Sequence, residues 1–235
     1  MKLAIVTTTT GRPWCFEQLQ DYYQTQTLVP DTWFCVGEDH NGYNFRCNQH
    51  VIQRKPKKSE KGHSLGLNWL TVLPLLKDFD YILPFEDDDV FFPNFFKVLV
   101  DMLLAGASLA GLQNCVYYQV RHRRFCKLHN LTHSALTSSI FTRELLPLVK
   151  KFAKGESVYL DYNLFNSFKG KISFTDNLEN NKPLYHVGLK GCPGLTGCGS
   201  FHTMADGSID WGGSKLREWL GKDAYRYMDL FESYH

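Results

Sequence analysis

Four consecutive carboxylates follow a short apolar segment near the middle of the chain, and this feature constrains the fold most. Tyr81 to Phe85 has the length and composition of a buried strand, and residues 86–89 are Glu-Asp-Asp-Asp. The apolar residues 90–92 come next and keep the acids close to the core. Four like charges repel one another unless a cation lies among them, and carboxylate oxygens suit a hard divalent ion. Because open α/β sheets bind ligands beyond the carboxyl ends of their strands, the run predicts a metal site rather than a solvated turn.

Strand and helix patterns alternate through the first half of the chain. Pro13 suits a first helical turn, and the helix that follows would bury Phe16, Leu19 and Tyr23. Ser64 is placed to begin a second helix, and a third follows Pro93 and ends at Gly106. The strands expected between them are Leu3 to Val6, Thr32 to Val36, Val51-Ile52 and the segment at Tyr81. Such alternation predicts an α/β fold with a mainly parallel central sheet flanked by helices.

The second half of the chain has a different pattern. Leu109 to Val120 is strand-like, and a helix is expected from Thr142 to Gly155. Another helix should hold Asp161 to Phe168. Lys190 to Gly199 contains four glycines and a proline, which is typical of a mobile loop. Apolar residues then recur at helical spacing from Leu216 to Phe231, so a helix packed on the domain is expected there.

Length and composition set limits on the class of protein. With 235 residues, 43% of them hydrophobic, the chain fits one domain over 1–235, with halves at 1–107 and 108–235. No apolar run approaches the ~20 residues of a membrane span, and the N-terminus does not resemble a signal peptide. Seven cysteines without a Cys-x-x-Cys pair favour free thiols in a reducing compartment. A cytoplasmic location is therefore expected.

The order of these landmarks resembles the GT-A-fold glycosyltransferases, most closely those of family 2. The first strand runs into Thr7-Thr8-Thr9-Thr10-Gly11-Arg12-Pro13, which is similar to their nucleotide loop. Residues 61–68 resemble their glycine- and asparagine-bearing helix, and residues 138–145 resemble the segment before the acceptor-side helix. The acids at 86–89, followed by Pro93, match the D-x-D region, with glutamate in place of the first aspartate. The resemblance covers about residues 1–190, and only the acidic run in its strand context is specific.

The resemblance implies a Rossmann-like GT-A domain with an acceptor-side extension, which transfers a sugar from a nucleotide-sugar, expected to be a UDP-sugar. A Mn²⁺ or Mg²⁺ ion would neutralise the leaving diphosphate. Asp88 is the expected direct ligand, Asp89 lies in a further shell, and His186 would supply a late imidazole ligand, although a lone histidine is more often only hydrogen-bonded in place. The donor contacts implied are Thr7, Thr8, Thr9, Arg12, Asp39, Lys61, Glu86 and Asp87.

An inverting transfer needs a base that takes the proton of the acceptor hydroxyl. Family members place an acid at a helix start on the acceptor side, and Asp161 is the matching residue. The alternative role is a helix N-cap aspartate. The usual two-acid version of the motif has a second carboxylate directly beside the first, whereas Leu160 stands there in this chain.

Two basic clusters, residues 54–61 and 121–124, bear on the acceptor. Either suits phosphate groups, although the first could equally be a solvated loop. Arg121, Arg123 and Arg124 are the expected acceptor contacts. By analogy with phage enzymes, the acceptor expected is a hydroxymethylated pyrimidine in duplex DNA. The alternatives are a surface polysaccharide or lipopolysaccharide acceptor and, from another class, a non-catalytic module that binds a nucleotide-sugar or DNA. The pattern leaves the oligomeric state open.

Overall fold

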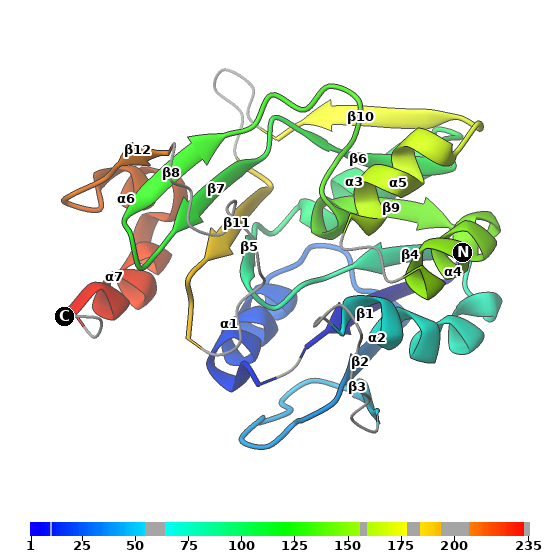
Figure 1. The fold of residues 1–235 in the computed structure, drawn as a ribbon, viewed down its shortest axis with the longest axis horizontal. Coiled ribbons are helices and arrows are strands. Elements are labelled where there is room, and N and C mark those ends of the chain that lie inside the picture. Colours follow the sequence, from blue (N-terminus) through cyan, green and yellow to red (C-terminus); the bar gives the residue numbers. More distant parts are fainter. Residues whose placement is uncertain (10, 55–63, 156–158, 178–183, 194–206, 233–235) are drawn as a thin grey trace.

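The computed structural model of the chain describes residues 1–9, 11–54, 64–155, 159–177, 184–193 and 207–232. Two sheets run through it, with helices packed around them (Figure 1). The larger sheet has seven strands in the order β10 (Ile172–Asp176), β6 (Leu109–Gln113), β9 (Ser139–Thr142), β4 (Tyr81–Pro84), β1 (Leu3–Thr8), β2 (Thr32–Gly37) and β3 (Gln49–Gln53). Its β4-β1-β2-β3 portion is parallel, as predicted, while β9 runs antiparallel to both of its neighbours.

The smaller sheet lies beside the larger one and has five strands. Their order is β12 (Ser208–Ile209), β8 (Arg124–Lys127), β7 (Val116–Gln119), β11 (His186–Lys190) and β5 (Asp89–Phe91). Strand β11 is parallel to β7 and antiparallel to β5, so it brings a late segment of the chain against the acidic run. The five strands of the smaller sheet lie outside the parallel β4-β1-β2-β3 portion of the larger sheet.

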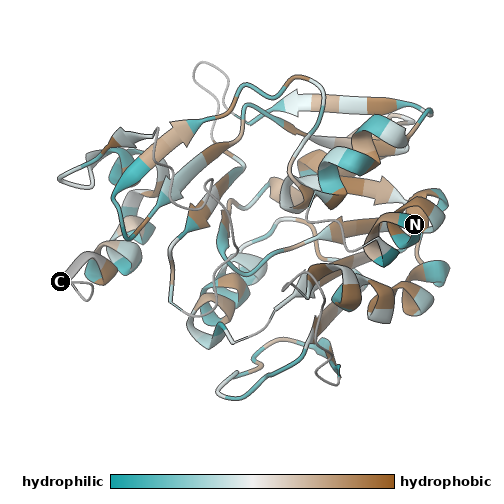
Figure 2. Ribbon diagram, in the orientation of Figure 1, coloured by the Kyte–Doolittle hydropathy of each residue, from teal (hydrophilic) through white to brown (hydrophobic). Residues whose placement is uncertain are grey.

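Seven α-helices surround the sheets within the described residues. They are α1 (Pro13–Gln24), α2 (Leu65–Val72), α3 (Phe95–Leu104), α4 (Leu146–Lys154), α5 (Leu160–Ser167), α6 (Ser214–Leu220) and α7 (Ala224–Glu232). No helix among them combines the length and apolar character needed to cross a membrane. Figure 2 shows apolar colouring along the central strands and mixed colouring on the helices, as expected for helices that pack one face on a sheet.

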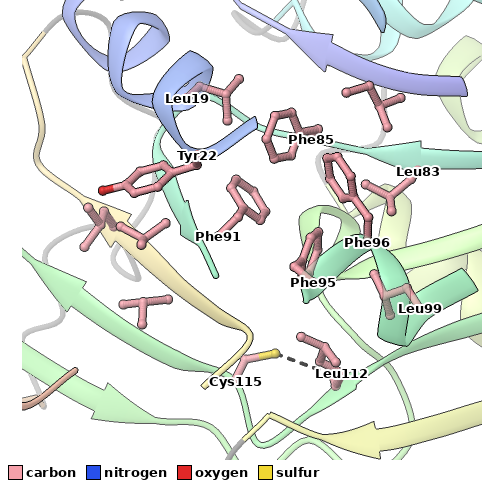
Figure 3. Close-up of a cluster of buried hydrophobic side chains, with 14 of the residues drawn as sticks. Leu19, Tyr22, Leu83, Phe85, Phe91, Phe95, Phe96, Leu99, Leu112 and Cys115 are labelled. Carbon is pink, nitrogen blue, oxygen red and sulfur yellow. Dashed lines mark hydrogen bonds between the residues drawn. The ribbon is translucent and has the colours of Figure 1, made fainter. Parts of the chain in front are cut away.

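The core is divided by the larger sheet, because alternate residues of a strand point to opposite faces. Leu3 and Ile5 belong to one buried cluster, which also holds residues of α1, α3 and the smaller sheet. Ala4 and Val6 belong to the other, together with residues of α2, α4 and α5. Figure 3 shows part of the first cluster, where Phe85 and Phe91 meet with ring centroids 4.4 Å apart. These aromatic side chains flank the acidic run and fix its place.

The elements predicted for the first half are present, and α1 begins at Pro13 as expected. Phe16 and Leu19 are buried in it, but Tyr22 rather than Tyr23 is the buried tyrosine of this helix. The predicted third strand is β3, and the third helix is α3. Ser64 precedes α2 but makes no side-chain cap hydrogen bond. The six cysteines among the described residues are free thiols, in agreement with the prediction.

Two predictions for the second half were wrong. Leu109 to Val120 is not one strand, because Asn114 has φ 53° and separates β6 in the larger sheet from β7 in the smaller one. The Asn114 side chain holds this turn by donating to Asp176 Oδ1 at 2.6 Å. Lys190 does not begin a loop but ends β11, while residues 194–199 of the predicted loop lie outside the described residues. The expected C-terminal helix is present as α6 and α7.

Asp210 caps the helix that follows the smaller sheet. Its Oδ2 accepts hydrogen bonds from the backbone N–H groups of Lys215 at 3.0 Å and Leu216 at 3.1 Å, and from the Tyr118 hydroxyl at 3.1 Å. Its Oδ1 accepts from Ser214 at 3.0 Å. Burial alone would raise the pKa of Asp210, but the hydrogen bonds from the two backbone N–H groups hold it below its ordinary value.

Asp210→Ala is therefore expected to lower the free energy of unfolding by about 2–3 kcal/mol. A carboxyl with a depressed pKa contributes stability above the unfolded-state pKa of about 4, and this contribution is lost as pH falls. The difference between wild type and variant in urea unfolding should thus be largest near pH 7 and should narrow below about pH 4. Asp229→Ala, which removes an exposed carboxyl from α7, is the control and should change stability little. A deficit for Asp210→Ala that does not vary with pH would contradict this origin.

Candidate functional site

The acidic run occupies the link between the two sheets. Strand β4 pairs with β1 up to Pro84, and the Thr7 hydroxyl donates to the Phe85 carbonyl at 2.6 Å. The chain then leaves the larger sheet and joins the smaller one at Asp89, the first residue of β5. The carboxylates are therefore held at both ends by paired strands. Their position at the carboxyl end of β4 is the one that the sequence predicts.

Arg12 bridges two of these carboxylates. Its Nη2 lies 2.7 Å from Asp87 Oδ1, and its Nη1 lies 2.9 Å from Asp88 Oδ2. Thr9 hydrogen-bonds the other oxygen of Asp87 and also the Tyr43 hydroxyl, the latter at 2.6 Å. The Tyr43 hydroxyl in turn accepts from the Arg12 backbone N–H at 2.8 Å. The loop after β1 is thus tied to the acidic run through these contacts.

His186 supports Asp89 from the interior. Its Nε2 lies 3.0 Å from Asp89 Oδ2, and both side chains are fully buried. The imidazole lies beside the rings of Phe91 and Phe95, with centroid distances of 5.3 and 6.0 Å. Asn177 accepts from the His186 N–H at 3.0 Å and donates to its carbonyl at 2.7 Å. His186 therefore reaches the cluster through Asp89.

The charges of this pair stabilise one another. Burial alone would lower the pKa of His186, but the Asp89 carboxylate raises it to about 9. Burial alone would raise the pKa of Asp89, whereas Lys190 and His186 hold it well below its ordinary value. Asp89 also accepts from the Leu189 N–H at 3.0 Å. We therefore expect a charged carboxylate beside an imidazolium at neutral pH.

The pKa of Glu86 is shifted in the opposite direction from that of Asp89. Burial, followed by the charges of Asp88 and Asp89, raises the pKa of Glu86 to about 8. Asp87 is buried too, and its pKa is raised to about 6 in spite of Arg12. Oxygen atoms of Glu86, Asp88 and Asp89 lie within 4.8 Å of one another, which makes these three the group among the described residues that is able to hold a metal ion. Among the described residues, the Glu86 carboxyl has no hydrogen bond or ion pair.

The predicted donor-side residues have different surroundings. Thr7 is buried and accepts from the Trp33 indole N–H at 2.9 Å, so it serves packing. Thr8 is buried in β1, whereas Thr9 reaches the acidic run. Asp39 lies beyond the end of β2 and accepts from the Asn41 N–H at 2.9 Å. Lys61 lies outside the described residues.

Asp161 lies in the first turn of α5. Burial raises the pKa of Asp161 above its ordinary value, against the opposing effect of hydrogen bonds from the Tyr162 and Leu136 N–H groups and the charge of His133. Asp161 retains local hydrogen bonds of the kind that a helix start uses. Tyr117, on β7, lies near the acidic cluster, with the Lys190 Nζ 5.9 Å from its ring centroid. Burial, followed by the charges of Cys115, Asp89, Asp161 and Glu86, raises the pKa of the Tyr117 hydroxyl well above its ordinary value.

Arg121 and Arg123 lie in the turn that joins β7 to β8, and Arg124 is the first residue of β8. Arg123 has φ 50°, and its guanidinium donates to the Trp211 carbonyl at 3.3 Å. Trp211 is 76% exposed. The end of β7 pairs with the end of β11, so this turn lies at the same end of the smaller sheet as Lys190 and the carboxylates.

Sequence reasoning missed three residues of the site. Lys190 places Nζ 3.4 Å from Asp88 and 3.6 Å from Asp89, but it stands in a glycine-rich context that favours a loop. Tyr117 belongs to a strand of the second sheet, which was not anticipated. Tyr43 lies in a segment without regular structure, and its only signal is a cluster of aromatic residues around it. Long-range pairing, which no local pattern encodes, brings these residues to the acids.

No protein-family profile matches the sequence, and no curated protein sequence matches it. Solved structures do align. Residues 1–349 of TarS from S. aureus, a glycosyltransferase, superpose with a TM-score of 0.55 and 13% identity over 80% of this chain and 60% of that one. Another TarS structure superposes with a TM-score of 0.53 and 12% identity over 80% of this chain and 37% of that one. A197 from STIV aligns with a TM-score of 0.44 and 11% identity over 75% of this chain and 82% of that one.

The chain therefore spans less than two thirds of the TarS structures that it matches. At this identity the likeness concerns the fold, and it agrees with the strand order and with the acids beyond β4. The chain has a GT-A-like fold, an α/β architecture in which helices flank a mainly parallel central sheet.

Proposed function

We propose that this protein is a glycosyltransferase that moves a sugar from a nucleotide-sugar to an acceptor hydroxyl. The observation that carries the proposal is the convergence of Glu86, Asp88 and Asp89 oxygens within 4.8 Å, at the carboxyl end of β4 in a GT-A-like fold. Three carboxylates are a hard oxygen donor set that suits Mn²⁺ or Mg²⁺. Glu86 makes no ion pair or hydrogen bond within the described chain, so the donor set has a place for a cation.

Glu86, Asp88 and Asp89 would hold the ion, which when bound supplies positive charge for the leaving diphosphate. His186 holds Asp89 in place through its 3.0 Å contact. Arg12 keeps Asp87 and Asp88 together and adds a permanent positive charge at the loop after β1. On the donor side, Thr9 positions this loop, and the exposed Asp39 side chain is available to the ribose or the base.

Asp161 is the proposed base. Its role is to take the proton of the acceptor hydroxyl while the sugar carbon is attacked from the side opposite the diphosphate, which gives inversion. A raised pKa suits a carboxylate for this task, because its affinity for the proton is higher.

For the acceptor we propose duplex DNA with hydroxymethylated pyrimidines. The arginine turn at residues 121–124 offers three cations for phosphates, and the adjacent Trp211 exposes an aromatic ring. Cations beside exposed aromatic side chains are the usual combination in nucleic-acid binding. The target hydroxyl would have to be reached in a groove or by base flipping. A surface glycan is the other acceptor class.

The proposal is tested by incubating the protein with single nucleotide-sugars and Mn²⁺ and measuring release of the nucleoside diphosphate, with and without acceptor. Modified DNA and a lipopolysaccharide fraction form separate arms, analysed for added sugar by mass spectrometry. Sugar on the DNA supports the full proposal, and sugar on the glycan alone would replace the acceptor. Donor binding without turnover in any arm would identify a binding module and contradict the enzymatic proposal.

The arginine turn has its own expected result. Affinity for duplex DNA should fall with salt at a log–log slope of about −0.9 for each phosphate contact. Charge reversal of Arg121, Arg123 and Arg124 to glutamate should weaken binding and flatten the slope, because phosphate contacts are lost. The matched control reverses Lys150, Lys151 and Lys154, three exposed lysines of α4, and should keep the slope. Equal slopes for the two triple variants, measured by fluorescence anisotropy, would exclude this DNA surface.

A further inference from the structure

Lys190 is a buried lysine at the last position of β11, directed at the acidic cluster. Its Nζ lies 3.4 Å from Asp88 Oδ2 and 3.6 Å from Asp89 Oδ1, and the residue is 9% exposed. The lysine ammonium therefore rests on two of the three carboxylates that are able to hold a metal ion.

Contacts of the backbone and of the neighbouring Tyr117 ring hold Lys190 in this position. Its carbonyl accepts from the Val120 N–H at 2.8 Å, and the next residue, Gly191, has φ 77°. The Tyr117 ring lies along the lysine, with Nζ 5.9 Å from the ring centroid. This ring fits because Gly188 has no side chain: a Cβ there would lie 2.3 Å from ring atoms. The stem is thus packed, and its ammonium end lies against the carboxylates of Asp88 and Asp89.

The three cations near the cluster balance three of its four acids. Arg12 pairs with Asp87 and Asp88, and His186 pairs with Asp89. Lys190 is the cation that contacts Asp88 and Asp89 together. An ammonium ion and a divalent ion repel each other strongly at such distances in a buried site. Each of the two cations is therefore expected to weaken the binding of the other at these oxygens.

We propose that Lys190 is the resident counter-cation of the acidic cluster, that it competes with the divalent ion, and that when displaced it binds the diphosphate of the donor. The competition rests only on contacts of this chain, whereas the diphosphate role rests on the proposed function. Lysine suits such an exchange, since its ammonium is a compact charge on a flexible stem with three donors. Displaced from Asp88 and Asp89, it remains anchored at the same edge, where the leaving group would be released.

Competition is measured by titrating the protein with Mn²⁺ and following free Mn²⁺ by electron paramagnetic resonance. Lys190→Met and Lys190→Gln remove the charge, and each should bind Mn²⁺ about tenfold or more tightly than wild type. Lys190→Arg keeps the charge and should resemble wild type. Lys97→Met is the matched control, because Lys97 pairs with Asp101 on the surface of α3, and it should leave Mn²⁺ affinity unchanged. Circular dichroism and thermal unfolding identify the variants that are folded.

The second arm uses inorganic pyrophosphate as the probe, at saturating Mn²⁺. Lys190→Met and Lys190→Gln should bind it about tenfold more weakly than wild type, in the opposite direction to their effect on Mn²⁺. A lysine with only a structural role would not shift the two affinities in opposite directions. Unchanged or weaker Mn²⁺ binding in both folded neutral variants would overturn the competition, as would absence of Mn²⁺ binding in all proteins. Unchanged pyrophosphate binding would overturn the diphosphate role.

These outcomes are separate from those of the proposed function, because neither titration contains a sugar donor or an acceptor. If the Mn²⁺ and pyrophosphate affinities shift in opposite directions but the protein transfers no sugar, the role of Lys190 is supported and the glycosyltransferase proposal is contradicted. If the protein transfers sugar but its Mn²⁺ affinity does not change in the Lys190 variants, the glycosyltransferase proposal is supported and the proposed role of Lys190 is contradicted.

Discussion

Asp88→Asn is expected to reduce sugar transfer by about 10²–10³-fold, because it removes one charged oxygen from the three-carboxylate group that is proposed to hold the metal ion. The fold should persist. Arg12 keeps Asp87 as a partner at 2.7 Å, and Lys190 keeps Asp89 at 3.6 Å, so no cation is left buried without a carboxylate. Donor affinity measured with Mn²⁺ should fall as well, whereas the small affinity measured with EDTA should be equal in wild type and variant.

The control for this variant is Asp101→Asn, which neutralises an exposed acid of α3 that pairs with Lys97. It should retain full turnover and the same thermal midpoint. Wild-type turnover that is insensitive to EDTA, or an Asp88→Asn protein with turnover within a few fold of wild type, would remove the metal assignment.

Asp161→Asn is expected to lower turnover by about 10²–10⁴-fold while donor affinity stays near that of wild type. Asparagine keeps the size of the side chain and an acceptor for the Tyr162 N–H, which Asp161 contacts at 2.8 Å. It lacks the ability to take a proton. Steady-state rates with saturating donor measure turnover, and calorimetric titration of the nucleoside diphosphate measures affinity at the donor site, so the two quantities are obtained separately. Glu144→Gln, at an exposed acid near the start of α4, is the control.

The pH profile gives an independent test of Asp161. A base is active only when unprotonated, so the rate should fall as pH drops below the pKa of Asp161, which burial holds above its ordinary value of 3.8. This acid limb should be absent from the residual activity of Asp161→Asn. A variant that keeps near-normal turnover, or the same acid limb, would show that another group accepts the proton.

Much of the parallel core could be predicted from sequence because its signals are local. Strand Leu3–Thr8 is buried on both faces, and its first four residues, Leu3 to Val6, form a continuous apolar run. Pro13 marks the start of the next helix. The acids at 86–89 were evident for the same reason, since they interrupt such a run. The resemblance to GT-A enzymes added the expected order of these elements.

The second sheet was not predictable in this way. Strand β5 has three residues, and its partner β11 supplies His186, which is 97 positions from Asp89. Neither strand has a period long enough to identify it, and the glycines around residue 190 favour a loop. Consequently the acids were predicted to need an external cation, whereas Arg12, His186 and Lys190 provide three internal ones.

The insertion of β11 between β5 and β7 also has a consequence for folding. The acidic residues leave the ribosome about a hundred positions before Lys190, which contacts Asp88 across a separation of 102 residues. Until β11 docks, the nascent domain has carboxylates near its core without two of their three cations, and β5 and β7 have unpaired edges. Such long-range closure is slow, so completion of the site is expected to be a late event in folding. A chain truncated before residue 186 would retain the parallel core but would have no assembled site.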